Sequence, residues 1–170
     1  VPSPMVVLAA LAARTSTITI GSGIVLAPLY DPVRFAEDCA VLDIISNGRL
    51  EMGLAIGYRR REYDAFGLDF TKRGARFDEF LQIIRALWAG ETVNFEGKHY
   101  TVRNARITPL SSRGQIHLNI GGFVEMAIER AAKYGDGYFG NPEFADIYLR
   151  KWQEQGKDPK AAGMLIPGLF

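Results

Sequence analysis

Residues 17–58 have the sequence TITIGSGIVLAPLYDPVRFAEDCAVLDIISNGRLEMGLAIGY, and the rest of the predicted fold is built around this stretch. Its β-branched residues predict a strand over residues 17–26, broken only by glycines. Apolar residues at helical spacing then predict a helix over residues 33–45. Asp31 is expected to be the N-cap of this helix, and Pro32 stands at its first position.

The predicted helix has an apolar side and a clear stop. The apolar side is expected to hold Phe35, Cys39, Leu42 and Ile45, and the polar residues expected largely elsewhere are Arg34, Glu37, Asp38 and Asp43. Asn47 and Gly48 tolerate the left-handed conformation that ends a helix. A second apolar run over residues 49–56 predicts another strand. Two strands joined by one crossover helix pair in parallel.

The rest of the chain continues the alternation of helices and strands. Helices are predicted over residues 4–13, 73–88, 124–134 and 141–155, strands over 116–120, 138–139 and 163–170, a hairpin over 91–107 and a long loop over 57–71. Strict alternation predicts an α/β fold with a parallel sheet, as in a (β/α)₈ TIM barrel. A complete barrel usually takes ~250 residues. Residues 1–170 are therefore expected to form a single domain, a partial barrel of about five strands with a β-hairpin insertion.

Composition excludes several classes of protein. The chain of 170 residues is 48% hydrophobic with a formal net charge of +1, and it has no basic stripe of the kind that binds nucleic acid. No span is long and apolar enough to predict a membrane helix, and residues 6–13 are interpreted as part of a core helix instead of a signal peptide. Cys39 is the only cysteine, so an intrachain disulfide is excluded. Cys39 is expected to be a core residue. A reducing cytoplasm is the predicted location.

Glycines mark two candidate ligand sites. Gly21 and Gly23 lie inside a predicted strand, where glycine indicates either a barrel bulge or close approach of a planar ligand along Ser22, Gly23 and Ile24. Gly121 and Gly122 lie between a strand and a helix. Glycines there serve either a tight turn or the binding of a phosphate by backbone N–H groups at the start of the helix.

The charged and catalytic side chains give weaker signals. The cations near the long loop are Arg59, Arg60, Arg61, Lys72, Arg73 and Arg76. Arg73 and Arg76 begin a helix, where they oppose its dipole, so they either serve an anion or lie on a solvated face. His99 and His117 are interpreted as packing or hydrogen-bonded residues. Neither has partners at metal-ligand spacing, so no metal site is predicted.

Several motifs in order resemble the luciferase-like monooxygenase superfamily. They are the run GSGIVLAPLYDPVRFAEDCAVLDIISNGRLEMGLAIG, the pair Phe66-Gly67, the helix RGARFDEF with Leu87-Trp88, the hairpin FEGKHY, the turn IGG and the run AAKYGDG. Together they cover most of the chain. The resemblance implies a (β/α)₈ barrel that binds FMN, or alternatively the deazaflavin F420, at the carboxyl ends of its strands.

The resemblance also implies positions for the cofactor. A non-proline cis peptide is expected at Gly23-Ile24, under the flavin ring. The phosphate is expected at the backbone of Gly121, Gly122, Phe123 and Val124, with help from Gly57, Tyr58, Arg73 and Arg76. Phe123 stands where many members have serine or threonine, and Ile56 stands where bacterial luciferase has arginine. Both departures leave backbone amides as the main phosphate donors.

The hypothesis that follows is a flavin-dependent monooxygenase, in which reduced FMN and O₂ oxygenate a small organic substrate. Two alternatives stay open: hydride transfer by F420, and a non-catalytic flavin-binding relative. The family's first strands, with the histidine loop associated with catalysis, would precede Val1, so no catalytic residue is named. Expected partners are a separate flavin reductase and a second copy of the chain, giving a homodimer or larger oligomer.

Overall fold

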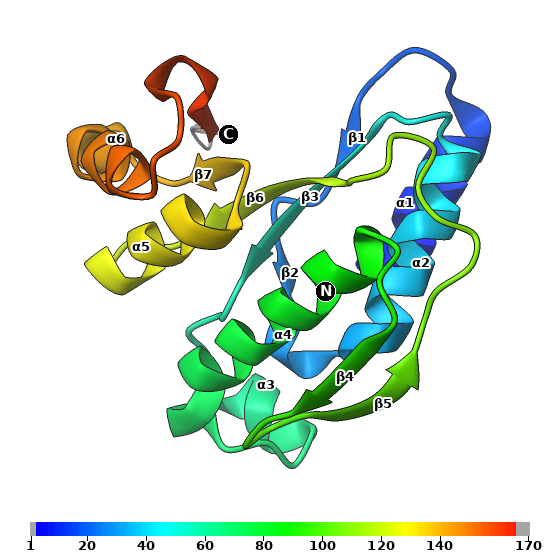
Figure 1. Cartoon of the computed structure of the whole chain (residues 1–170), viewed down its shortest axis with the longest axis horizontal. Helices are drawn as coiled ribbons and strands as arrows, with labels where there is room; N and C mark the ends of the chain where they lie inside the picture. The colour runs from blue at the N-terminus through cyan, green and yellow to red at the C-terminus, as the bar shows by residue number, and fades with distance from the viewer. Residues whose placement is uncertain (1–2, 166–170) are drawn as a thin grey trace.

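The predicted strands pair in one parallel sheet. A computed structural model describes residues 3–165, with this sheet at the centre (Figure 1). The strands are β1 Ile20–Gly21, β2 Val25–Leu26, β3 Leu50–Ala55, β6 His117–Gly121, β7 Gly137–Phe139 and β8 Gly163–Leu165. Their order is β1-β3-β6-β7-β8, and β2 also pairs with β3. Because β1 and β2 pair with the same strand, the sheet is five strands wide, as the sequence predicts. Within residues 3–165 the sheet does not close into a barrel.

Helices connect these strands, as the alternation predicts. They are α1 Pro4–Arg14, α2 Pro32–Ile45, α3 Arg60–Ala65, α4 Arg73–Trp88, α5 Glu125–Tyr134 and α6 Ala145–Glu154. Short 3₁₀ turns occupy Ala27–Leu29, Phe70–Lys72, Pro142–Phe144 and Pro159–Ala161. The N-cap prediction is confirmed, because Asp31 Oδ1 accepts hydrogen bonds from the N–H groups of Val33 at 3.0 Å and Arg34 at 2.9 Å. The stop is confirmed too, with φ of +54° at Asn47 and +76° at Gly48.

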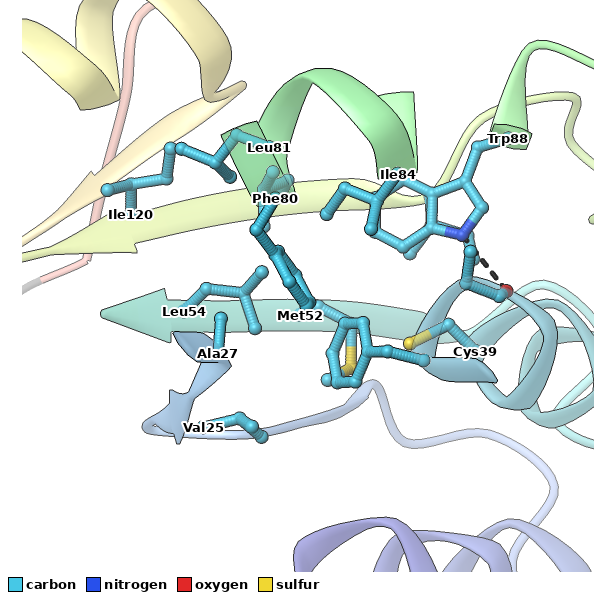
Figure 2. Packing of buried hydrophobic residues seen from close by; sticks show 14 of the residues in the cluster. Val25, Ala27, Cys39, Met52, Leu54, Phe80, Leu81, Ile84, Trp88 and Ile120 are labelled. Atoms are coloured by element: carbon cyan, nitrogen blue, oxygen red, sulfur yellow. Dashed lines mark hydrogen bonds between the residues drawn. The ribbon is translucent and has the colours of Figure 1, made fainter. Parts of the chain in front are cut away.

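The main core lies between the sheet and the helices α2 and α4. Figure 2 shows Phe80, Leu81 and Ile84 of α4 pointing toward Met52 and Leu54 of β3 and Ile120 of β6. The indole N–H of Trp88 donates to the carbonyl of Ala36 on α2 at 3.1 Å, which joins the two helices. Cys39 is fully buried in this core, as predicted.

The predicted hairpin is formed by β4 Val93–Glu96 and β5 Thr101–Ala105, which pair antiparallel. It lies beside α4 and away from the parallel sheet (Figure 1). The carboxylate of Glu79 on α4 accepts the N–H groups of Lys98, His99 and Tyr100 at 2.8, 2.9 and 3.0 Å. A carboxylate holding three backbone donors fixes the hairpin turn to the helix.

The predicted continuous strand over residues 17–26 is wrong. The chain leaves the sheet between β1 and β2, and Ser22 bridges the gap. Its hydroxyl donates to the carbonyl of Gly53 at 2.9 Å and accepts the N–H of Gly53 at 3.1 Å. A side chain thus replaces backbone pairing at the point where the glycines let the strand bend.

Three other predictions also need correction. The stretch 57–71 is not one irregular loop, because α3 forms within it. Ile45 is 47% exposed, although it was assigned to the apolar side of α2. Asp43 is fully buried, although the helical pattern placed it largely away from the apolar side. Of the strand predicted over residues 163–170, the structure contains Gly163–Leu165, and residues 166–170 lie outside the described part.

Asp43 is buried because a distant loop supplies its partners. Its carboxylate accepts hydrogen bonds from the Ser111 hydroxyl at 2.7 Å, the Ser112 hydroxyl at 3.3 Å and Arg113 Nη2 at 3.2 Å. Arg113 Nη2 also donates to the carbonyl of Leu50 at 2.6 Å. This network ties the segment before β6 to α2 and to the start of β3.

Candidate flavin site at the carboxyl ends of the strands

The candidate site has two parts, named here for the parts of FMN expected to bind there: a ring end and a phosphate end. The ring end is the segment between β1 and β2. The peptide bond between Gly23 and Ile24 is cis, at the position that the family resemblance implies. Ile24 then extends over the sheet on the face opposite the core: a side-chain carbon on Gly53 would lie 3.0 Å from Ile24 Cγ2. One on Gly121 would lie 3.4 Å from Ile24 Cδ1. Glycines on two neighbouring strands therefore leave room for the Ile24 side chain.

The phosphate end of the candidate site follows β6. Gly121 ends the strand, and Val124 is the N-cap of α5 with no side chain capping the helix. The first N–H groups of α5 are therefore available to an anion. A side-chain carbon on Gly122 would clash with Ala127, so only glycine lets the chain pass this close to α5. Phe123 and Val124 are 60% and 59% exposed, so the segment faces outward.

Of the predicted cations, Arg73 has a buried donor atom without a partner among the described residues, and Arg76 has no such atom. Arg76 Nε donates to the carbonyl of Pro28 at 2.9 Å, and its guanidinium lies 4.2 Å from the centre of the Tyr100 ring. Arg73 Nη1 donates to the carbonyl of Phe70 at 2.8 Å, whereas its buried Nε has no partner among the described residues. The geometry favours Arg73 over Arg76 as an anion ligand.

The first half of α4 packs against α5. Arg130 of α5 forms a bidentate pair with Asp78 of α4, through Nε at 2.6 Å and Nη2 at 3.1 Å. A side-chain carbon on Gly74, the residue after Arg73, would lie 3.0 Å from Arg130 Nη2. The ion pair fixes α5 against α4.

Gly57 and Tyr58 follow β3 and lie beside the ring end. Gly57 has a φ of +72°, a conformation that favours glycine, and a side-chain carbon there would lie 3.0 Å from Leu26 Cδ2. Tyr58 is 78% exposed, and the Arg59 guanidinium lies 5.3 Å from the centre of its ring. Arg60 and Arg61 begin α3 and are exposed.

Tyr63 of α3 lies beneath this end of the site. Its hydroxyl donates to the carbonyl of Ile56. Burial raises the pKa of Tyr63 to about 12, although the positive charges of Arg73 and Arg76 oppose the shift. The hydroxyl is therefore a permanent donor at neutral pH, and it holds the end of β3 in place.

Sequence reasoning missed Tyr138 and Phe139 of β7. The hydroxyl of Tyr138 donates to the carbonyl of Gly122 at 2.7 Å, and the ring of Phe139 lies beside Gly23. The pattern predicted the strand but not its register with β6, so these contacts had no signal in the sequence. Within residues 3–165 no group of histidine, cysteine or carboxylate side chains could hold a metal ion, and no helix has the length and hydropathy to span a bilayer.

Comparison with known proteins identifies the family. The model of the luciferase-like monooxygenase family matches residues 1–163. The chain belongs to the luciferase-like monooxygenase family.

Two curated relatives illustrate the range of this family. The oxygenase component of a flavin-dependent trigonelline monooxygenase from Acinetobacter baylyi is 39% identical over 92 residues, covering 53% of this chain and 26% of the relative. An F420-dependent glucose-6-phosphate dehydrogenase from Amycolatopsis mediterranei is 33% identical over 135 residues, covering 76% of this chain and 40% of the relative.

A solved structure agrees with the fold. The monooxygenase RslO1 from Streptomyces bottropensis superposes with a TM-score of 0.88 at 29% identity, covering 97% of this chain and 54% of that structure. The chain spans about half the length of RslO1. It spans less than half the length of the two curated relatives. The open edge of the sheet agrees with a partial barrel.

Proposed function

We propose that this protein is a flavin-dependent monooxygenase of the luciferase-like family, which uses reduced FMN and O₂ to oxygenate a small organic substrate. The observation that carries the proposal is the pairing of two structural features beside strands β2 and β6, which flank β3 in the sheet. One is the cis segment Gly23-Ile24 beside the glycines of β3 and β6, and the other is the uncapped start of α5 after Gly122. The names of relatives such as the trigonelline monooxygenase support the same chemistry.

The residues present fit FMN. The cis peptide bond at Gly23-Ile24 would support the ring, and Ile24, whose side chain lies over Gly53 and Gly121, would provide an apolar contact. The backbone N–H groups of Phe123 and Val124 and the side chain of Arg73 would hold the phosphate. When bound, reduced FMN would supply the electrons for O₂ activation. The chain's own part is to bind and orient it and to exclude water with apolar side chains.

F420 is the second candidate cofactor, because one relative is named an F420-dependent dehydrogenase. With F420 the reaction would be hydride transfer without O₂. Reconstitution with each cofactor distinguishes the two proposals. We expect saturable binding of FMN, followed by FMNH₂- and substrate-dependent O₂ uptake. Preferential binding of F420 and substrate-dependent F420 reduction without O₂ uptake would contradict the FMN proposal. Binding without any turnover would favour the non-catalytic alternative.

A separate flavin reductase is a proposed partner, since the trigonelline relative is named an oxygenase component. We also propose a cytoplasmic location and a homodimer. The dimer would use α1 and α2, which expose an apolar surface and border a groove of about 410 Å³. The apolar side chains at this surface are Val6, Val7, Leu11, Val41, Ile44 and Ile45, each at least 40% exposed. Arg34, Glu37 and Asp38 at its rim carry both charge signs, which suits contact with an identical surface.

A further inference from the structure

Strand β7 contacts both ends of the proposed flavin site. At the ring end, a side-chain carbon on Gly23 would lie 3.4 Å from Phe139 Cζ and 3.6 Å from Cε2. The Phe139 ring therefore lies beside the cis peptide bond, on the face of the sheet opposite the core. Phe139 is in register with Gly121 of β6, so its partner residue on β6 has no side chain.

At the phosphate end, Tyr138 and Phe139 hold Gly122 through both of its backbone polar groups. The N–H of Gly122 donates to the carbonyl of Phe139 at 3.4 Å, and the Tyr138 hydroxyl donates to the carbonyl of Gly122 at 2.7 Å. This fixes the peptide planes on each side of Gly122. The direction of the following N–H groups depends on these planes.

The Tyr138 hydroxyl reaches Gly122 through a space kept open by another glycine. A side-chain carbon on Gly140 would clash with the ring and hydroxyl of Tyr138. Tyr138 is fully buried, and its ring packs against Tyr148 with centroids 5.4 Å apart. Burial raises the pKa of Tyr138, so the hydroxyl stays a donor at neutral pH.

We propose that Phe139 is a flavin-binding residue whose ring contacts the isoalloxazine, and that Tyr138 is a positioning residue that aims the phosphate-binding amides. This inference rests on the proposed function, and it assigns separate tasks to adjacent residues. Phe139 acts on the ring that FMN and riboflavin share. Tyr138 acts on the phosphate that only FMN carries.

The separate tasks can be tested by titrating the protein and its variants with FMN and riboflavin while recording flavin fluorescence. For Phe139→Ala we expect both flavins to bind about tenfold more weakly, because an aromatic contact of about this worth is lost. The bound flavin should also become more fluorescent, since a stacked aromatic ring quenches its emission. Phe139→Trp should restore quenching. Phe66→Ala, at a ring that is 62% exposed elsewhere, is the control.

For Tyr138→Phe we expect FMN to bind about tenfold more weakly, with riboflavin changed less than about twofold. The matched control is Tyr148→Phe, which removes a buried hydroxyl that has no partner among the described residues. It should leave the ratio of the two affinities unchanged.

Each half of the inference can fail separately. Unchanged fluorescence and affinity in Phe139→Ala would overturn the role of Phe139. Equal weakening of FMN and riboflavin in Tyr138→Phe, or an equal effect of Tyr148→Phe, would overturn the role of Tyr138. If the wild-type protein bound neither flavin, the proposed function would fail and the inference with it.

Discussion

Glu79 shows at the scale of one residue how a side chain off the site shapes the fold. We expect Glu79→Gln to lower the free energy of unfolding by about 1.5–3 kcal/mol, because three backbone N–H groups lose a charged acceptor. Urea unfolding measures the change. Glu37→Gln, which removes an exposed ion pair with Arg34, should cost less than about 1 kcal/mol. Equal costs for both variants would contradict this account.

The same carboxylate predicts a dependence on pH. Although burial opposes it, the N–H groups of His99, Lys98 and Tyr100 hold the pKa of Glu79 below its usual value. A lowered pKa stabilises the fold above the unfolded value of about 4.3, and this contribution is lost as the pH falls through the folded pKa. In urea unfolding, the gap between wild type and Glu79→Gln should be constant above about pH 5 and shrink below about pH 4. A stability difference between wild type and Glu79→Gln that grew toward low pH would contradict a lowered pKa of Glu79.

Asp43 predicts a larger loss of stability. We expect Asp43→Ala to lower the free energy of unfolding by about 3 kcal/mol, because two serine hydroxyls and Arg113 lose their shared acceptor. Asp38→Ala on the same helix is the control, since the Asp38 side chain is only half-buried, and it should change stability by less than about 1 kcal/mol. A cost for Asp43→Ala as small as that of the control would contradict the burial of the network.

Local patterns predicted whole elements well at the scale of helices and strands. The periodicity of residues 73–88 gave α4 with its observed bounds, and Asp31 gave the start of α2. Local patterns gave wrong predictions where contacts with segments distant in the sequence determine the structure. Asp43 is buried because the loop before β6 packs on it, and the break after β1 depends on Ser22 reaching Gly53.

The cap of α2 supplies a prediction at this scale. Asp31→Ala should lower the free energy of unfolding by about 1 kcal/mol, because the N–H groups of Val33 and Arg34 lose their acceptor. Asp31→Asn is the matched variant, since asparagine caps helices equally well, and it should cost only a few tenths of that amount. The comparison fails if both variants are equally destabilised in thermal unfolding.

At the scale of the whole molecule, the exposed surface of α1 and α2 predicts an oligomer. Val41→Glu places a charge at the centre of the proposed interface and should raise the dimer dissociation constant by about thirtyfold or more, measured by analytical ultracentrifugation. Leu149→Glu is the control, because Leu149 on α6 is similarly exposed, at 38% against 40% for Val41. A monomeric wild-type protein, or a dimer that Val41→Glu leaves intact, would contradict the proposed interface.

The candidate site was predictable in part. The cis peptide bond at Gly23-Ile24 was expected from the family resemblance and is confirmed, whereas the ligand-binding roles of Gly121 and Gly122 stay predictions. The contacts of Arg76, Tyr138 and Phe139 did not follow from the sequence. They depend on the register of β6 with β7 and on the packing of α4 against the hairpin, which no local pattern encodes.

We propose that FMN lies across the carboxyl ends of β2, β3 and β6, with its phosphate at the start of α5. A crystal structure of the protein with FMN bound tests it most directly. The account predicts the isoalloxazine beside Gly23-Ile24 and the phosphate accepting hydrogen bonds from the N–H groups of Phe123 and Val124. A phosphate bound at Arg59, Arg60 and Arg61, or a ring away from the cis peptide bond, would contradict it.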